Sequence, residues 1–177
     1  GQSTGAQTQC INSSFTPISV TATGTGTLTY QWYSNSVAST TGGSVISGAT
    51  NSSYTPLATT AGSIYYYVTV SGDCGTVTSA ISGAFVVNTA TAITSESLGG
   101  QTECIGNSFS PISVTATGTG TLNYQWYSNT SASTSGGTAI FGANSSTFTP
   151  PSATVGTQYY YVVVSSDCGS ATSAISG

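Results

Sequence analysis

The chain has no lysine, arginine, histidine or methionine, and only four of its 177 residues are acidic. Nucleic acids and anionic membrane surfaces are bound mainly through basic side chains that neutralise phosphate, so neither is an expected partner. No apolar run is long enough to span a bilayer, and we expect no direct membrane insertion. The composition therefore excludes most recognition of charged polymers.

The same scarcity leaves almost nothing for catalysis. There is no histidine or lysine to act as a general base near neutral pH, and no arginine to hold an oxyanion. Gly24–Leu28 is rich in glycine but lacks the lysine of a phosphate-binding loop, so we expect a hairpin turn there. Asp73 and Asp167 each stand alone in their half of the chain, too few for calcium, and zinc lacks its usual ligands. The chain is predicted not to be an enzyme and to need no cofactor.

What the chain does contain is a repeat with a period of 94 residues. Thr21–Asn35 returns almost unchanged as Thr115–Asn129, and 54 of the 83 aligned pairs are identical without a gap. Internal repeats at a fixed period indicate a tandem of one structural module. We therefore predict two domains, residues 1–92 and residues 93–177. The second copy stops before any counterpart of Ala84–Asn88, as expected for a segment of a longer array.

Within each module the hydrophobic pattern is that of short strands. Leu28, Tyr30 and Trp32 alternate with polar residues, and the run 64–70 is the strongest strand. A last strand is predicted over 76–87, with a bend at Gly83. Around seven short strands ended by turn residues, with no helical period, predict an all-β fold built as an antiparallel two-sheet sandwich.

The four cysteines are placed identically in the two modules, 64 residues apart in each. This spacing favours two disulfides, Cys10–Cys74 and Cys104–Cys168, which would indicate an oxidising, extracellular location. Closing a loop of that size stabilises a fold by roughly 4 kcal/mol in the chain-entropy model. The alternative is four buried free thiols.

Aromatic residues offer the remaining candidates for a site. Trp32 and Trp126 share a strand face with leucine and tyrosine, so we predict core positions and not glycan-stacking platforms. Tyrosines of the opposite strand faces are predicted to form an exposed strip in each module: Tyr33, Tyr65 and Tyr67 in the first, and Tyr127, Tyr159 and Tyr161 in the second. Such a strip could contact glycans or a neighbouring filament. It could also serve only as cross-strand pairing within the sheet.

The motif S-F-x-P-I-S-V-T-A-T-G-T-G-T-L-x-Y-Q-W-Y, followed by Y-Y-Y-V-x-V-S-x-D-C-G, occurs in both copies. It resembles the immunoglobulin-like repeats of large secreted proteins of Bacteroidota, including the giant surface adhesins of gliding flavobacteria. The resemblance implies two tandem immunoglobulin-like antiparallel β-sandwiches of about seven strands each. Unlike in antibody domains, Cys10 precedes the strand that begins at Ile18, so a bridge from it would pin an end of the sandwich.

Together these observations lead to a functional hypothesis. The chain is expected to be a structural or adhesive repeat of an extracellular filament or giant cell-surface adhesin, acting as a stiff, disulfide-stapled stalk with an uncharged contact face. Its partners would be neighbouring repeats of the same chain or filament, with glycans or other surfaces as further candidates. The alternative is a carbohydrate-binding or spacer module of a multidomain secreted enzyme.

Overall fold

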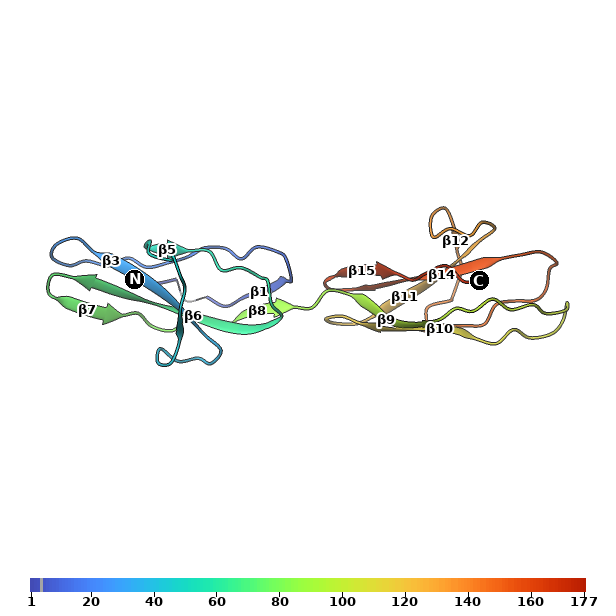
Figure 1. Cartoon of the computed structure of the whole chain (residues 1–177), viewed down its shortest axis with the longest axis horizontal. Helices are drawn as coiled ribbons and strands as arrows, with labels where there is room; N and C mark the ends of the chain where they lie inside the picture. The colour runs from blue at the N-terminus through green and yellow to red at the C-terminus, as the bar shows by residue number, and fades with distance from the viewer. Residues whose placement is uncertain (4) are drawn as a thin grey trace. The chain divides into compact units, whose positions relative to one another are not determined.

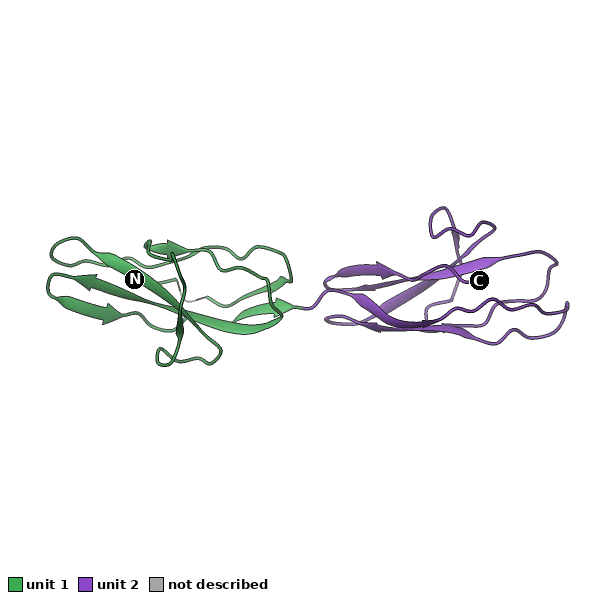
Figure 2. Ribbon diagram, in the orientation of Figure 1, with its two compact units in different colours: residues 1–88 green, residues 89–177 purple. Residues whose placement is uncertain are grey.

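The computed structural model describes residues 1–3 and 5–177, and the fold is all-β, as predicted. The chain divides into two compact units, residues 1–88 and residues 89–177 (Figure 2). The division falls four residues before the boundary expected from the repeat, because Phe85–Asn88 is the last strand of unit 1. Within the described residues there is no helix of the length and hydropathy that crossing a membrane would require.

Unit 1 is a sandwich of a large and a small sheet (Figure 1). In the large sheet, neighbouring strands follow the order β1 (Gln7–Cys10), β8 (Phe85–Asn88), β6 (Gly62–Gly72), β3 (Thr29–Asn35) and β4 (Ser44–Val45), and β7 (Gly75–Thr78) also pairs with β6. The small sheet consists of β2 (Ile18–Ser19) and β5 (Ser53–Tyr54). All pairs are antiparallel except β1 with β8, which run parallel in the register Gln7↔Phe85 to Cys10↔Asn88.

The core of unit 1 is organised by the central pair β3–β6. Trp32 lies opposite Val68 in this pair, and both side chains are fully buried. The indole N–H of Trp32 donates to the carbonyl of Asn51 at 2.9 Å, which satisfies its one polar group inside the core. The rest of the buried cluster consists of Phe15, Ile18, Ala49, Ala58, Tyr66, Phe85 and Val87.

The predicted strand over 76–87 is interrupted in the structure and forms two strands, β7 and β8. Between them, the hydroxyls of Ser79 and Ser82 accept hydrogen bonds from the β6 amides of Val68 and Tyr66, at 3.0 and 2.8 Å. Gly83 follows, where a side chain would approach the backbone nitrogen of Ala6 to 2.7 Å. The chain leaves β6 as a regular strand partner here because serine hydroxyls take the place of backbone carbonyls as acceptors for the β6 amides. Gly83 has no side chain, which leaves room for the segment at Ala6 to pass close by.

Unit 2 repeats the same central pair. Its larger sheet has the order β12 (Thr138–Ala139), β11 (Asn123–Asn129), β14 (Tyr159–Ser166) and β15 (Gly169–Thr172), and the second sheet has the order β13 (Thr147–Phe148), β10 (Ile112–Thr117) and β9 (Ala92–Ser97). Trp126 lies opposite Val162, is fully buried, and donates its indole N–H to the carbonyl of Ser145 at 2.8 Å. The two copies thus bury the same tryptophan by the same means.

Candidate contact surface and cysteine sites

The tyrosines singled out in the sequence form a ring pair on the outer face of each central strand pair. In unit 1, Tyr33 of β3 lies opposite Tyr67 of β6, and the rings are stacked with centroids 4.9 Å apart and an angle of 2° between their planes. In unit 2, Tyr127 and Tyr161 stack in the same way at 5.0 Å and 5°. Cross-strand aromatic pairs of this kind stabilise a sheet.

One member of each pair is not exposed, which corrects the expected strip. Tyr67 and Tyr161 are each only 5 % exposed, although they lie on the face opposite the core. The loop after β3 covers the Tyr67 ring, and a side chain at Gly43 would come within 2.7 Å of ring atom Cε1 and 3.0 Å of the Ser34 carbonyl. The alternation of side chains along a strand predicts the correct sheet face for these tyrosines, but it does not predict that a loop covers one of them in each unit.

An asparagine at the end of the central strand holds this covering loop in place. The Asn35 amide donates to the carbonyls of Ser39 and Thr41, at 2.8 and 3.0 Å, and its oxygen accepts the amide N–H of Val37. Asn129 makes the equivalent three bonds in unit 2, to Ser133, Ser135 and Ser131. Asn35 and Asn129 end the most strongly repeated segment, but no motif in the sequence indicates this role.

The other predicted contact tyrosines remain accessible. Tyr33 and Tyr65 in unit 1, and Tyr127 and Tyr159 in unit 2, are half-buried. A shallow depression of about 270 Å³ in unit 1 is lined not by these tyrosines but by Ser34, Asn35, Ser36, Gly42, Ser44 and Ile64. Its lining is mostly hydroxyl, amide and backbone, and no charged side chain contributes to it.

Burial affects the ionisation of tyrosines in the cores. Burial, together with a smaller effect of the nearby phenol of Tyr54, raises the pKa of Tyr66 to about 12. Burial also raises the pKa of Tyr54 and of Tyr160. Neutral phenols are therefore favoured by the folded state at alkaline pH.

Asp73, Glu96 and Glu103 each make contacts within their own unit. The amide of Asp73 donates to the carbonyl of Thr25 at 3.1 Å, and a side chain at Gly26 would collide with the Asp73 carboxylate. Glu96 accepts the amide N–H of Ala174 at 3.0 Å, and Glu103 accepts from the side-chain amide of Asn107 at 3.2 Å. Among residues 1–3 and 5–177, no group of three potential metal ligands comes together.

The cysteines differ from the expected pairing. Cys10 and Cys168 are disulfide-bonded, whereas Cys74 and Cys104 are exposed free thiols. Each predicted pair therefore combines one bonded with one free cysteine, so the bridges Cys10–Cys74 and Cys104–Cys168 are not formed. The alternative of four buried free thiols is also wrong.

The register of the large sheet explains why these pairs cannot form. Cys10 lies level with Asn88, next to the Val87↔Gly62 pair at the start of β6, whereas Cys74 follows Gly72 at the end of β6. Ten residue steps of strand span about 33 Å, while a disulfide needs Cα atoms within about 7 Å.

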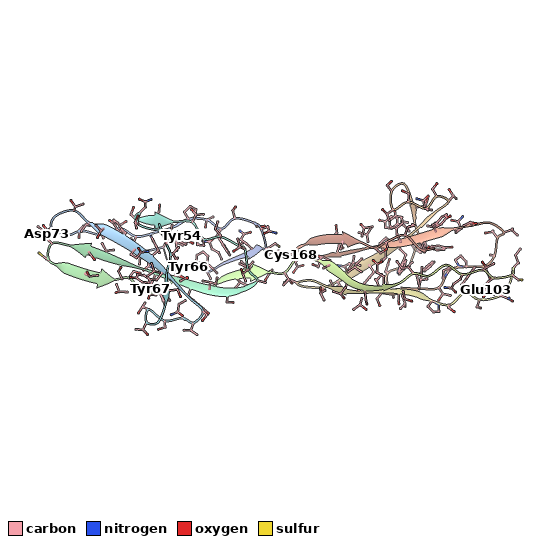
Figure 3. The ribbon with its side chains drawn as sticks, in the orientation of Figure 1. Tyr54, Tyr66, Tyr67, Asp73, Glu103 and Cys168 are labelled. Carbon is pink, nitrogen blue, oxygen red and sulfur yellow. The ribbon has the colours of Figure 1, made fainter. Side chains whose placement is uncertain are left out.

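Unit 2 shows the same separation of its two cysteines. Cys168 lies in the hairpin after β14, and Glu103, the neighbour of Cys104, lies at the other end of the unit (Figure 3). Each sandwich thus carries one cysteine at each end.

The topology and the buried tryptophans define the class of the protein: two immunoglobulin-like β-sandwiches in tandem. A family model described as "Domain of unknown function (DUF8696)" matches residues 1–88 and again residues 92–176, so the chain belongs to this family and contains two copies of its domain. A comparison with curated proteins found no match.

Solved structures of similar fold include tandem immunoglobulin domains. A titin I-band fragment is 13 % identical with a TM-score of 0.60, over 99 % of this chain and 62 % of that one. The IG1+IG2 fragment of DIP-gamma is 11 % identical with a TM-score of 0.53, over 97 % and 91 %. Extracellular domains 3–5 of Drosophila OTK are 14 % identical with a TM-score of 0.51, over 97 % and 58 %. The chain thus spans less than two thirds of the titin and OTK fragments, and at these identities the likeness shows the fold alone.

Proposed function

We propose that the chain is a structural repeat segment of an extracellular filament or large cell-surface adhesin, and that it works by bearing tension and by uncharged contact. The family of secreted repeats of Bacteroidota that the sequence resembles is consistent with this role. A tandem of near-identical sandwiches without a catalytic constellation in the described residues favours a mechanical over a chemical task.

The parallel pairing of β1 with β8 is the observation that carries the proposal. Tension along the chain pulls β1 towards its start and β8 towards its end, so the two parallel strands are loaded in opposite directions along their length. The ladder bonds, including Gln7 N–H to the Ala84 carbonyl at 3.0 Å and Ile11 N–H to the Asn88 carbonyl at 2.9 Å, lie across this direction and are strained together. Sharing load among several bonds resists force better than breaking them one at a time.

Two further contacts support the load path into β1. The bridge between Gln2 and Val20 connects the preceding segment to β2. The Gln7 side-chain amide both donates to the carbonyl of Thr16, at 3.1 Å, and accepts the Thr16 amide N–H, at 2.8 Å. The start of the unit is therefore attached to both sheets before force reaches the ladder.

Single-molecule pulling on the whole chain in a reducing buffer tests the load-bearing role; the reductant is needed because disulfides at Cys10 and Cys168 would limit how far the chain can extend. Gln7→Pro removes the amide that donates to Ala84 and also the side-chain bonds, whereas Gln7→Ala removes the side-chain bonds alone. We expect Gln7→Pro to lower the unfolding force of unit 1 well below that of Gln7→Ala. Each unfolding event should lengthen the chain by about 250 to 300 Å, the extended length of one unit. Equal forces for the two variants would contradict the role of the ladder.

The extracellular location has its own test. Antibodies against the purified chain should label intact cells of the source organism as strongly as permeabilised cells. Labelling that requires permeabilisation would contradict the proposed location while leaving the mechanical result untouched.

Carbohydrate binding is the second candidate, and the partial exposure of Tyr33 and Tyr65 is the observation that favours it. Half-exposed tyrosine rings are suited to contact with uncharged sugars. A glycan array with the wild type, Tyr33→Ala and Tyr65→Ala would decide between the roles. Saturable binding that both substitutions abolish would favour the carbohydrate-binding module, and absence of binding would favour the structural repeat.

A further inference from the structure

Strand β8 fills a position between β1 and β6 in unit 1, and its inward side chains complete the core there. Phe85 and Val87 are 0 % and 4 % exposed. The Phe85 ring lies edge-on against the rings of Phe15 and Tyr66, with centroids 5.1 Å apart in both pairs. β8 pairs parallel with β1 and antiparallel with the start of β6. One short strand therefore joins two backbone edges and closes the core between them.

In unit 2 the corresponding position is open. Gly177 corresponds to Gly83, so residues 89–177 contain no counterpart of β8. The two backbone edges that β8 joins in unit 1 correspond to residues 101–104 and 156–158, and neither of these segments forms a strand. The structure thus shows the same strand position twice, once occupied and once empty.

Apolar side chains around the open position are uncovered compared with unit 1. Ile105 is 63 % exposed, whereas its counterpart Ile11 packs against the unit 1 core. Phe109 is half-exposed and lies outside the described cluster of unit 2, whereas its counterpart Phe15 is buried. Apolar surface of this kind favours an occupant that covers it.

Both walls of the open position nevertheless have the conformation seen in unit 1. The Gln101 side chain donates to the carbonyl of Ser110 at 3.0 Å and accepts its amide N–H at 2.8 Å, as Gln7 does with Thr16. On the other wall, Gly156 has a φ of 139°, against 134° for its counterpart in β6. Little rearrangement is therefore needed before a strand can pair with either wall.

The chain also reaches the open position as it does in unit 1. The hydroxyl of Ser176 accepts the amide N–H of Tyr160 at 2.8 Å, as the hydroxyl of Ser82 accepts that of Tyr66. An added Cβ at Gly177 would lie 2.7 Å from the backbone nitrogen of Gly100, the same close approach that Gly83 makes to Ala6. In unit 1 only Ala84 separates this point from the first buried residue of β8.

We propose that unit 2 has a strand-accepting site whose occupant is an extended segment with the pattern of Ala84–Asn88, joined directly after Gly177. The segment runs parallel to residues 101–104 and antiparallel to residues 156–158, as β8 does in unit 1. Its aromatic residue packs against Phe109 and Tyr160, and its backbone pairs with both walls. Adding a strand to an open sheet edge combines main-chain hydrogen bonds with pockets for alternate side chains. The site does not depend on the proposed function.

Extending the chain tests the site. A copy of residues 84–92 is added after Gly177, and the matched control carries the same extension with serine at the counterparts of Phe85 and Val87. Thermal unfolding of unit 2 is followed by Trp126 fluorescence in a Trp32→Phe background. Because the segment buries a phenylalanine and a valine, we expect its Tm to rise by about 10 °C or more, and the serine control to show little of this gain.

Hydrogen exchange shows where the added segment lies. In unit 1 the amides of Gln7 and Ile11 donate to the carbonyls of Ala84 and Asn88 at 3.0 and 2.9 Å. The corresponding amides of Gln101 and Ile105 should therefore exchange about tenfold more slowly, or slower still, in the extended chain than in the serine control. Equal Tm values for the two extended chains would overturn the proposal. A higher Tm without slower exchange at Gln101 and Ile105 would also overturn it.

A free peptide distinguishes a joined strand from one supplied by another molecule. The peptide Ala-Phe-Val-Val-Asn is added at about 1 mM to the unextended chain, and exchange at Gln101 and Ile105 is measured again. A joined segment has a millimolar or higher effective concentration and needs no separate association, so we expect weaker protection by the free peptide. Protection as strong as in the extended chain would overturn direct joining and assign the site to a strand of another molecule.

Discussion

The covered tyrosine pair makes a sharp prediction in unit 2, where an open and a crowded glycine can be compared. An added Cβ at Gly137 would lie 2.8 Å from Cε1 and 2.8 Å from Oη of Tyr161, and 3.0 Å from the carbonyl of Ser128. Carbon contacts are normally 3.5–4.0 Å, so the ring or the loop must move by roughly 0.7 Å. Overpacking of this kind costs about 1–3 kcal/mol.

Gly99→Ala is the matched control. Nothing lies within 4 Å of its added Cβ and its φ is not in the left-handed region, so we expect a change between zero and about 1 kcal/mol of stabilisation. For a unit of this size, the cost at Gly137 corresponds to a fall in Tm of about 4 to 20 °C. Urea and thermal unfolding can be followed by Trp126 fluorescence in a Trp32→Phe background, where Trp126 is the one remaining tryptophan.

A double-mutant cycle identifies the cause. In a Tyr161→Ala background the loop has no ring to cover, so Gly137→Ala should lose most of its cost, giving a coupling of about 1 kcal/mol or more. If Gly137→Ala and Gly99→Ala have the same effect on stability, the stacked and covered ring does not hold the loop as described.

The remaining predictions concern single groups. Ser82→Ala removes the hydroxyl that accepts the buried Tyr66 amide N–H at 2.8 Å, and it should lower the free energy of unfolding by about 1–3 kcal/mol. Ser36→Ala, at an exposed position, is the control and should change it little. Equal urea midpoints for the two variants would contradict the prediction. Burial raises the pKa of Tyr66 to about 12, from an unfolded value near 10, so between these pH values the folded state keeps a proton that the unfolded state loses. The neutral phenol of Tyr66 therefore stabilises the folded state fully below about pH 10. This stabilisation, roughly 2 kcal/mol, is lost as the pH rises towards 12. Tyr66→Phe should flatten that alkaline loss in urea titrations at pH 9 to 11.5, and an unchanged slope would contradict the assignment. A thiol reagent should titrate two cysteines per native chain and four after reduction and unfolding, since Cys74 and Cys104 are exposed thiols; four reactive thiols before reduction would contradict the bonded state of the other two.

Period, alternation and turn residues were enough to predict the all-β fold and the central strands. The repeated Leu28–Tyr30–Trp32 pattern placed the tryptophan on a core-facing strand position because side chains alternate strictly along a strand. The short strand β1 was missed, since Gln7–Cys10 has no apolar alternation and is defined by its partner β8. Pairing with a distant segment cannot be read from local composition.

The predicted cysteine pairs and the predicted exposure of Tyr67 and Tyr161 were wrong for the same reason. Both depend on where distant segments lie: the length of β6 separates Cys10 from Cys74, and the loop at Gly43 covers Tyr67. Equal spacing in two copies indicates equivalent positions, but it does not say whether those positions meet. The glycine that follows a polar loop in both copies, Gly43 and Gly137, was the one local signal of a close approach.

We proposed that the parallel β1–β8 ladder of unit 1 shares load along its length, and pulling the reduced protein in two directions can confirm or exclude this. Handles at Gly1 and Asn88 strain the β1–β8 bonds together, whereas handles at Asn12 and Asn88, at the same end of the two strands, separate the bonds one after another. We expect the first geometry to need a markedly higher unfolding force than the second in the same protein. Equal forces in the two directions would contradict it.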